Sequence, residues 1–219
     1  MTAKKRDNSA LEAKIALRRQ AIAAAESPVV LETHAGEGLI FLQCYTGVTK
    51  GWALEKDKDL LDRMTQQRER WFCYQCESEK ILADAPRAFD ANFIDVDPHG
   101  SPWPVLEALF NPHRFTAPTL HLVVHDGSRR FLAIGASGSS DQRWRVGLLA
   151  ELAAEYGDDL RANYSDLALV AISKLAKPCG YTVRKWTAFY TGHDSHSTHY
   201  WATLKAERSA IHRTKSTII

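Results

Sequence analysis

The sequence predicts an α/β fold: a mostly parallel seven-stranded sheet with helices on both faces and a C-terminal antiparallel hairpin. Two observations carry this prediction. Short apolar, β-favouring runs alternate with helical segments over residues 28–126, and short connections between such elements indicate parallel strands. Two further β-runs, 180–190 and 199–206, follow one another across a short polar connection and predict the closing hairpin.

Composition sets bounds on the class of protein. The chain has 219 residues, of which 45% are apolar and 25% charged, which is ordinary for one large globular domain. A net charge of only +2 predicts no overall field that would require a nucleic-acid partner, although local patches remain open. No apolar run approaches the roughly 18 residues of a membrane span, and the first residues lack the apolar core of a signal peptide. We therefore expect a cytoplasmic protein without a membrane partner.

The chain divides into three predicted segments, a basic helical segment over 1–26, the main domain over 27–206 and a basic tail over 207–219. The first helix should run from about residue 9 to 26, with apolar residues at helical spacing on one side and Lys14, Arg18 and Arg19 on the polar side. Two interpretations stay open for this helix. It packs on the edge of the domain with its basic residues solvated, or it contacts nucleic-acid phosphates.

A glycine-containing turn follows the first predicted strand. The buried run 29–32 leads into Thr33-His34-Ala35-Gly36-Glu37-Gly38, and a helical segment comes next. A strand, a glycine turn and a helix form the first half of a nucleotide-binding unit. Because Glu32 and Glu37 flank this turn, a pyrophosphate is disfavoured and a ligand with an amino group or a positive charge is favoured. S-adenosylmethionine has both.

The next two predicted strands end in carboxylates. The strand 51–54 ends at Glu55, which lies 17 residues after Gly38, close to the spacing at which such folds place an acid against ribose hydroxyls. The strand 71–76 ends at Glu77, and an amphipathic helix separates the two strands. The Cys73-x-x-Cys76 pair in the strand 71–76 has half of a zinc spacing, but no second pair lies at a suitable distance. We therefore expect reduced thiols in a buried strand.

The fourth predicted strand, 89–96, breaks sharply at Asp97-Pro98-His99-Gly100, and Ser101-Pro102 opens a helix. A carboxylate at the C-terminal end of a central strand lies where open α/β sheets bind their ligands. Ordinary turn chemistry explains the same tetrapeptide equally well. The turn alone therefore leaves a functional and a structural interpretation open.

The pattern continues with a fifth strand over 119–125, a loop over 128–141, helices over 143–156 and 165–175, and the hairpin. His193, His196 and His199 have a spacing compatible with a metal site, but without a nearby cysteine or carboxylate cluster we expect a polar hairpin loop and no metal. Basic residues near Trp144 and in the C-terminal tail are candidate phosphate contacts, with a solvated surface as the alternative: Arg143, Arg145, Lys205, Arg208, His212, Arg213 and Lys215.

With these pieces in place, residues 28–206 resemble the class I S-adenosylmethionine-dependent methyltransferases, which have a Rossmann-like fold. Within that class they look most like the methyltransferase domain of the tRNA guanine-N2 methyltransferases. VLETHAGEG is similar to the family's VLDxxAGxG, and FIDVDPHGSPWPVLEA to its IDIDPFGSPxxFLDA over almost the whole length. VVHDG is weakly similar to the family's TATD, and His199-Tyr200 is weakly similar to its terminal HY. The sequence departs from the family at His99, an aromatic position, at Glu32, and in lacking the C-terminal RNA-binding domain.

The resemblance implies methyl transfer to an exocyclic amino group of a nucleobase in tRNA-like RNA or in DNA, with S-adenosylhomocysteine as the second product. It implies that Asp97 and the Pro98 carbonyl accept hydrogen bonds from the amine and that His99 stacks on the base. The cofactor-binding residues that it implies are Glu32, Thr33, His34, Ala35, Gly36, Gly38, Glu55, Lys56, Glu77, Ser78 and Asp97.

Three alternatives remain open on the sequence alone. The acceptor is a protein or a small molecule, the chain is a non-catalytic nucleic-acid-binding module with this fold, or a partner subunit replaces the RNA-binding domain.

Overall fold

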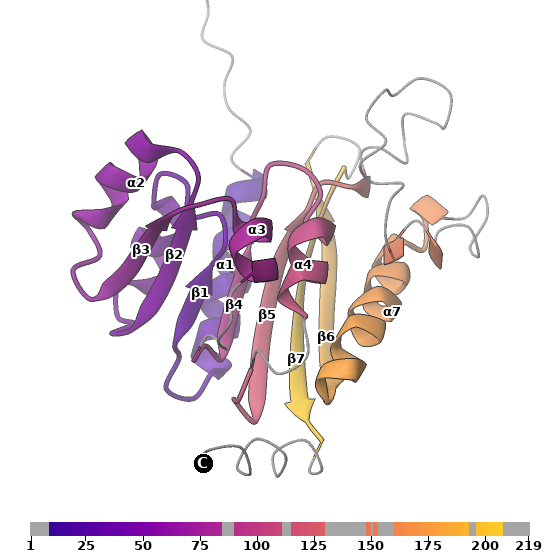
Figure 1. The fold of residues 1–219 in the computed structure, drawn as a ribbon. Helices are drawn as coiled ribbons and strands as arrows, with labels where there is room; N and C mark the ends of the chain where they lie inside the picture. The colour runs from indigo at the N-terminus through magenta and orange to yellow at the C-terminus, as the bar shows by residue number, and fades with distance from the viewer. Residues whose placement is uncertain are drawn as a thin grey trace, which may run out of the picture.

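A seven-stranded sheet forms the centre of the computed structural model, which describes residues 9–84, 90–110, 115–129, 148–149, 151–152, 160–192 and 196–207. The strand order is β3-β2-β1-β4-β5-β7-β6 (Figure 1). The strands are β1 (Val30–Glu32), β2 (Gly51–Glu55), β3 (Trp71–Gln75), β4 (Phe93–Val96), β5 (Thr119–Asp126), β6 (Tyr181–Thr191) and β7 (Ser197–Ala206). Strands β1 to β5 are parallel, and β7 runs antiparallel to both of its neighbours. The predicted α/β fold with its antiparallel hairpin is confirmed.

The topology of the sheet fixes where a ligand can bind. Strand β1 pairs with β2 on one side and with β4 on the other, because the chain first proceeds outward to β3 and then returns past β1. Glu32 at the end of β1 is in register with Asp95 of β4. Crevices outside the carboxyl ends of strands at such a reversal are the ligand sites of open α/β sheets. The glycine turn after β1 and the Asp97 turn after β4 both lie at this point.

Helices cover both faces of the sheet (Figure 1). Apolar side chains on alternate positions of the strands divide into two cores. The first core packs against α3, α4 and α7, and the second, which includes Leu17 and Met64, packs against α1, α2 and a π-helix. The elements are α1 (Ser9–Ala24), the π-helix η1 (Phe41–Tyr45), α2 (Lys58–Thr65), α3 (Ser78–Asp84), α4 (Trp103–Leu109), α7 (Tyr164–Ala176) and the 3₁₀-helix η4 (Lys177–Cys179).

Two expectations about burial are wrong. The strand with the two cysteines, β3, is an edge strand rather than a buried one, and Phe72 and Tyr74 on it are 52% and 48% exposed. The polar side of α1 is also misassigned, because Arg18 is fully buried together with Leu17 and Ala21. Apolar composition identified the strand in the first case, but only the strand order determines which strand lies at the edge.

Several predictions fall on residues outside the described ranges. These are most of the predicted loop at 128–141 and of the helix at 143–156, with the basic residues near Trp144, and also His193 and the tail from residue 208 onward. The fourth strand begins at Phe93 rather than at residue 89, and residues 85–89 are likewise outside the described part. Within the described part of the chain, no helix is both long and apolar enough to cross a membrane.

Candidate functional site

The glycine turn after β1 has a backbone shape that requires glycine. Gly36 and Gly38 have φ angles of 53° and 78°, in the left-handed region that side chains with a Cβ rarely adopt. The turn is tied to neighbouring strands by backbone hydrogen bonds from Thr33 N to the Asp95 carbonyl, at 3.0 Å, and from Ala35 N to the Leu54 carbonyl, at 3.1 Å. No heavy atom lies within 4 Å of a Cβ built on Gly36, so the turn leaves open space at this residue.

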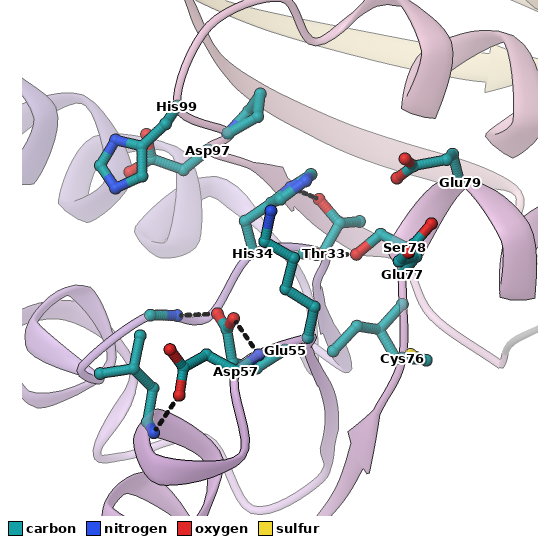
Figure 2. A pocket seen from close by; sticks show the side chains of 15 residues that line it. Thr33, His34, Glu55, Asp57, Cys76, Glu77, Ser78, Glu79, Asp97 and His99 are labelled. Atoms are coloured by element: carbon teal, nitrogen blue, oxygen red, sulfur yellow. Dashed lines mark hydrogen bonds between the residues drawn. The ribbon is translucent and has the colours of Figure 1, made fainter.

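The Glu55 carboxylate, at the end of β2, supports the turn from below. Its Oε2 accepts a hydrogen bond from Gly36 N at 2.8 Å and its Oε1 accepts one from Asp57 N at 2.9 Å (Figure 2). A carboxylate has about four lone-pair positions. Two positions of Glu55 therefore remain for hydroxyl donors of a ligand.

The end of β3 contributes a third group of residues beside the glycine turn and Glu55. Ser78, at the start of α3, is buried and its hydroxyl donates a hydrogen bond to the Thr33 carbonyl, which ties this segment to the glycine turn. Glu77 is more exposed and forms an ion pair with Lys80 at 2.7 Å. The segment thus places one anchored hydroxyl and one carboxylate beside the turn.

The Asp97 turn is held by its contact with the end of β5. Gly127 N donates a hydrogen bond to the Gly100 carbonyl at 2.9 Å, and a Cβ on Gly127 would lie only 3.0 Å from that carbonyl oxygen. Beneath it, the fully buried Asp126 carboxylate accepts hydrogen bonds from Trp103 Nε1 at 3.1 Å and from the Tyr164 hydroxyl at 2.8 Å. This network fixes the start of α4, and with it the turn that presents Asp97.

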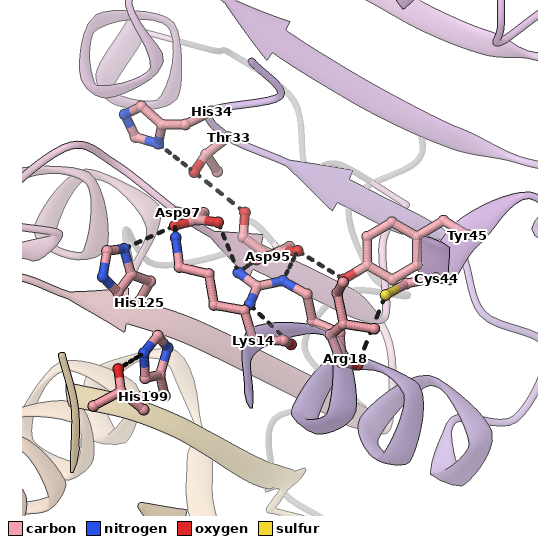
Figure 3. A network of polar contacts seen from close by, with 12 residues as sticks. Lys14, Arg18, Thr33, His34, Cys44, Tyr45, Asp95, Asp97, His125 and His199 are labelled. Atoms are coloured by element: carbon pink, nitrogen blue, oxygen red, sulfur yellow. Dashed lines mark hydrogen bonds and ion pairs between the residues drawn. The ribbon is translucent and has the colours of Figure 1, made fainter. Parts of the chain in front are cut away.

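Asp97 is surrounded by cationic groups and an imidazole from other elements (Figure 3). Its Oδ1 lies 2.7 Å from Lys14 Nζ and 2.9 Å from His125 Nδ1, and its Oδ2 lies 3.3 Å from Arg18 Nη2. Burial alone would raise the pKa of the Asp97 carboxyl, but Arg18, His125 and Lys14 outweigh it and hold that pKa well below its ordinary value. These contacts therefore favour the ionised form of Asp97.

Arg18 connects the Asp97 carboxylate to the carboxylate of Asp95. Its Nε and Nη2 donate to the two Asp95 carboxylate oxygens at 2.7 and 2.6 Å, and the Tyr45 hydroxyl donates to the same carboxylate at 2.7 Å. Such a bidentate geometry is the strongest form of an arginine–carboxylate contact. Both interpretations of the basic side of α1 were therefore wrong for Arg18, which is neither solvated nor available to phosphates.

A cavity of about 530 Å³ joins the carboxyl ends of β1, β2, β3 and β4, and its size suits a nucleoside-sized ligand. Figure 2 shows Asp97 and His99 at one end of it and Cys76, Ser78 and Glu79 at the other. The structure brings ten predicted residues together in its lining: Thr33, His34, Gly36, Glu55, Lys56, Glu77, Ser78, Asp97, Pro98 and His99. It does not bring Glu32, Ala35 or Gly38 into that lining.

Glu32 instead has a structural contact below the turn. Its Oε2 lies 2.5 Å from Nη1 of the buried Arg68, whose guanidinium lies over the Phe41 ring at 4.4 Å. Burial raises the pKa of Glu32 to about 7 although Arg68 acts in the opposite direction. This buried pair links the end of β1 to the segment after α2.

Sequence reasoning missed five residues of the lining: Leu54, Asp57, Leu60, Cys76 and Glu79. Asp57 had a detectable signal, because a polar residue just before an amphipathic helix is an N-cap, and its carboxylate accepts from Asp59 N and Leu60 N. The lining carries more acidic than basic residues, with Lys56 as its one lysine or arginine among the described residues. This charge suits a cationic ligand and opposes a pyrophosphate.

The histidines and cysteines form no metal centre among the described residues. His34 lines the cavity with its Nδ1 2.9 Å from the Thr33 hydroxyl, and burial lowers its pKa, so it is neutral. His199 is buried and stacks on His125 with ring centroids 4.9 Å apart. The four cysteines are free thiols of intermediate exposure.

Comparison with known proteins supports the fold through structure and not through sequence. No family model and no curated protein matches the sequence. Among solved structures, Trm1 from Pyrococcus horikoshii, in complex with S-adenosyl-L-methionine, superimposes with a TM-score of 0.63 at 18% identity over 96% of this chain. The chain spans only 58% of the length of that Trm1 chain.

Two further structures agree with this comparison. TYW2 from M. jannaschii, in complex with AdoMet, matches 89% of this chain and 76% of its own at a TM-score of 0.55 and 12% identity. The N-methyltransferase NodS from Bradyrhizobium japonicum WM9 matches 92% of this chain and 99% of its own, at a TM-score of 0.56 and 10% identity. The sheet order, the antiparallel β7 and these neighbours together show the Rossmann-like fold of class I methyltransferases.

Proposed function

We propose that this chain is an S-adenosylmethionine-dependent methyltransferase that acts on an exocyclic amino group of a nucleobase in RNA. The observation that carries the proposal is one cavity that contains Gly36, the Glu55 carboxylate and the Asp97-Pro98-His99 turn. The structural similarity to Trm1 and TYW2, both described in complex with this cofactor, supports it.

The donors of the cavity fit this cofactor. Glu55 keeps lone pairs for the two ribose hydroxyls, Ser78 and Glu77 lie where an adenine would contact the end of β3, and the acidic lining suits a sulfonium. The neutral His34 adds no repulsion to a positive charge. S-adenosylmethionine would supply an electrophilic methyl group on its sulfur.

The residues at the Asp97 end would act on the acceptor. An exocyclic amine is a weak nucleophile because its lone pair is delocalised into the ring. The anionic Asp97 and the Pro98 carbonyl would accept its hydrogen bonds, hold nitrogen close to the methyl group and offset the positive charge that nitrogen gains. On methyl transfer, the nitrogen would gain the carbon that the sulfur loses, and the surplus proton on nitrogen would pass to water. The exposed His99 would stack on the base.

The test is transfer of labelled methyl groups to separate pools of tRNA, ribosomal RNA, duplex DNA and single-stranded DNA. Label should enter an RNA pool with the wild-type protein, and Asp97→Ala should remove it while S-adenosylmethionine binding, measured by calorimetry, persists. Nucleoside digestion then identifies the modified base. Cofactor binding without label in any pool would overturn the nucleic-acid acceptor and favour a protein or small-molecule acceptor. Unchanged turnover in Asp97→Ala would overturn the role of Asp97.

A further inference from the structure

The side chain of Lys14 places a primary amine on Asp97, the carboxylate that the proposed function assigns to the acceptor amine. Lys14 Nζ lies 2.7 Å from Asp97 Oδ1 and reaches it from α1 (Figure 3). Lys14 is not among the described residues that line the cavity, whereas Asp97 is. Asp97 therefore contributes to the cavity lining and also holds an amine from α1.

Of the two cations at Asp97, Lys14 is the one that can leave. Arg18 is fully buried and donates two hydrogen bonds to Asp95 as well as approaching Asp97. The Lys14 side chain is 20% exposed, and within the described part of the chain its ammonium contacts Asp97 alone. A lysine ammonium sits on a flexible four-carbon stem, so it can swing into solvent without disturbing the helix that carries it.

Two carboxylates face two lysine or arginine cations in the resting structure, and the His125 imidazole lies beside them on Asp97. Asp95 and Asp97 contribute two negative charges, and Arg18 and Lys14 contribute two positive ones. The neighbouring His199 does not add a charge, because burial lowers its pKa to about 3. When Lys14 leaves, Asp97 keeps only the Arg18 guanidinium, which it shares with Asp95, and the His125 imidazole.

We propose that Lys14 Nζ marks the acceptor subsite, and that the amino group of the acceptor replaces it on Asp97 Oδ1, between α1 and the end of β4 and beside His125. This inference rests on the proposed function and adds to it the position of the acceptor and the group that it displaces. Before the reaction, the neutral acceptor amine replaces the Lys14 ammonium. The acceptor balances the negative charge of Asp97 only when its nitrogen becomes positive during methyl transfer. Binding that strengthens in the transition state is what accelerates a reaction.

The first test measures the Lys14–Asp97 contact without any acceptor. Acetic anhydride at limiting concentration acetylates free amines, and peptide mass spectrometry gives the extent at each lysine. We expect Lys14 to react at least about threefold more slowly in the wild-type protein than in Asp97→Asn, because an ion pair withholds the amine. Lys50, which pairs with Asp90 and is 46% exposed, is the matched control and should react equally in both proteins. Equal labelling of Lys14 in the two proteins would overturn the proposal.

The second test measures competition with the acceptor. Lys14→Met removes the amine and keeps the length of the side chain, so KM for a tRNA transcript should fall by about threefold and kcat should not fall. Arg19→Met, on the same helix but bonded to the Gln43 carbonyl at 3.1 Å, is the control and should change neither value. A KM that rises in Lys14→Met would overturn the proposal, because Lys14 would then be a contact to the nucleic acid.

The two tests separate this inference from the proposed function. A wild-type protein that binds S-adenosylmethionine but methylates no nucleic acid overturns the proposed acceptor. Protection of Lys14 in that protein still supports an amine-binding subsite on Asp97, and an unprotected Lys14 overturns it.

Discussion

The Arg18 guanidinium and the Asp95 carboxylate form two hydrogen bonds, of 2.6 and 2.7 Å, although 77 positions separate them in the sequence. Both side chains are buried, at 0% and 1% exposure. The pair fastens α1 to the central strand of the sheet, directly beneath the candidate site. Removing one partner would leave the other as an uncompensated buried charge, which is costly.

Arg18→Met should therefore destabilise the protein by about 3–5 kcal/mol, as a loss in the free energy of unfolding measured by urea denaturation. Arg19→Met, one position along α1 and exposed, should stay within about 0.5 kcal/mol of the wild type. A loss in the free energy of unfolding below about 1 kcal/mol in Arg18→Met would contradict a stabilising role for the Arg18–Asp95 pair.

The glycine turn makes a second prediction, about cofactor affinity. Gly36→Val forces a β-branched residue into a φ of 53°, although nothing in the protein crowds its Cβ. S-adenosylmethionine binding, measured by calorimetry, should weaken by at least about tenfold, since about 1–2 kcal/mol of strain and a side chain in the cavity act together. Gly47→Val, where the surrounding space is equally open and φ is not positive, should bind normally. Normal titration of Gly36→Val would refute the position of the cofactor.

His99 provides a third prediction. The side chain is exposed at the end of the cavity beside Asp97, and its proposed role is stacking on the acceptor base. His99→Phe should keep or raise kcat/KM for the RNA acceptor, because a phenyl ring offers an aromatic face without a protonatable nitrogen. Complete loss of transfer would show that the imidazole nitrogens donate or accept a required hydrogen bond.

His199 gives a fourth prediction, about pH. Its ring lies between those of His125 and Phe189, and burial lowers its pKa to about 3, so the native state holds this side chain neutral. An unfolded histidine takes up a proton near pH ~6.5. The native pKa is the lower one, so His199 contributes stability above that pH, and the contribution is lost as pH falls toward 3.

His199→Phe keeps an aromatic ring in the stack and removes the titration. Its free energy of unfolding should fall less between pH 7 and 5 than that of the wild type, by about 1–2 kcal/mol. Urea denaturation at the two pH values provides the measurement. Parallel losses in both proteins would mean that His199 is not held neutral.

Sequence reasoning identified the parts of the site that are contiguous in the chain. The glycine turn, Glu55 and the Asp97 turn each follow directly from a strand whose apolar run is visible, and parallel topology brings the strand ends to one edge. The same alternation of strands and helices predicted the order of elements and the closing hairpin. Local patterns were sufficient wherever a residue of the cavity lining directly follows the end of a strand.

The pairs between distant segments could not be predicted in this way. Arg18 looks like a surface residue of an amphipathic helix, and only the packing of α1 on β5 and β7 reveals its two carboxylate partners. Glu32 looked like a ligand contact because it flanks the turn, yet Arg68, from the segment after α2, takes its carboxylate. Nothing in one sequence marks which of several charged residues will meet across the core.

The position of α1 has a consequence for how the site is assembled during synthesis. The first helix leaves the ribosome well before β4, so Lys14 and Arg18 exist as exposed cations until Asp95 and Asp97 follow. A fragment that began at Ser27 would retain every strand of the sheet and the whole described lining of the cavity, but both carboxylates would lack their α1 counterions. The sheet therefore has to be expressed with its first helix if Asp95 and Asp97 are to keep these counterions.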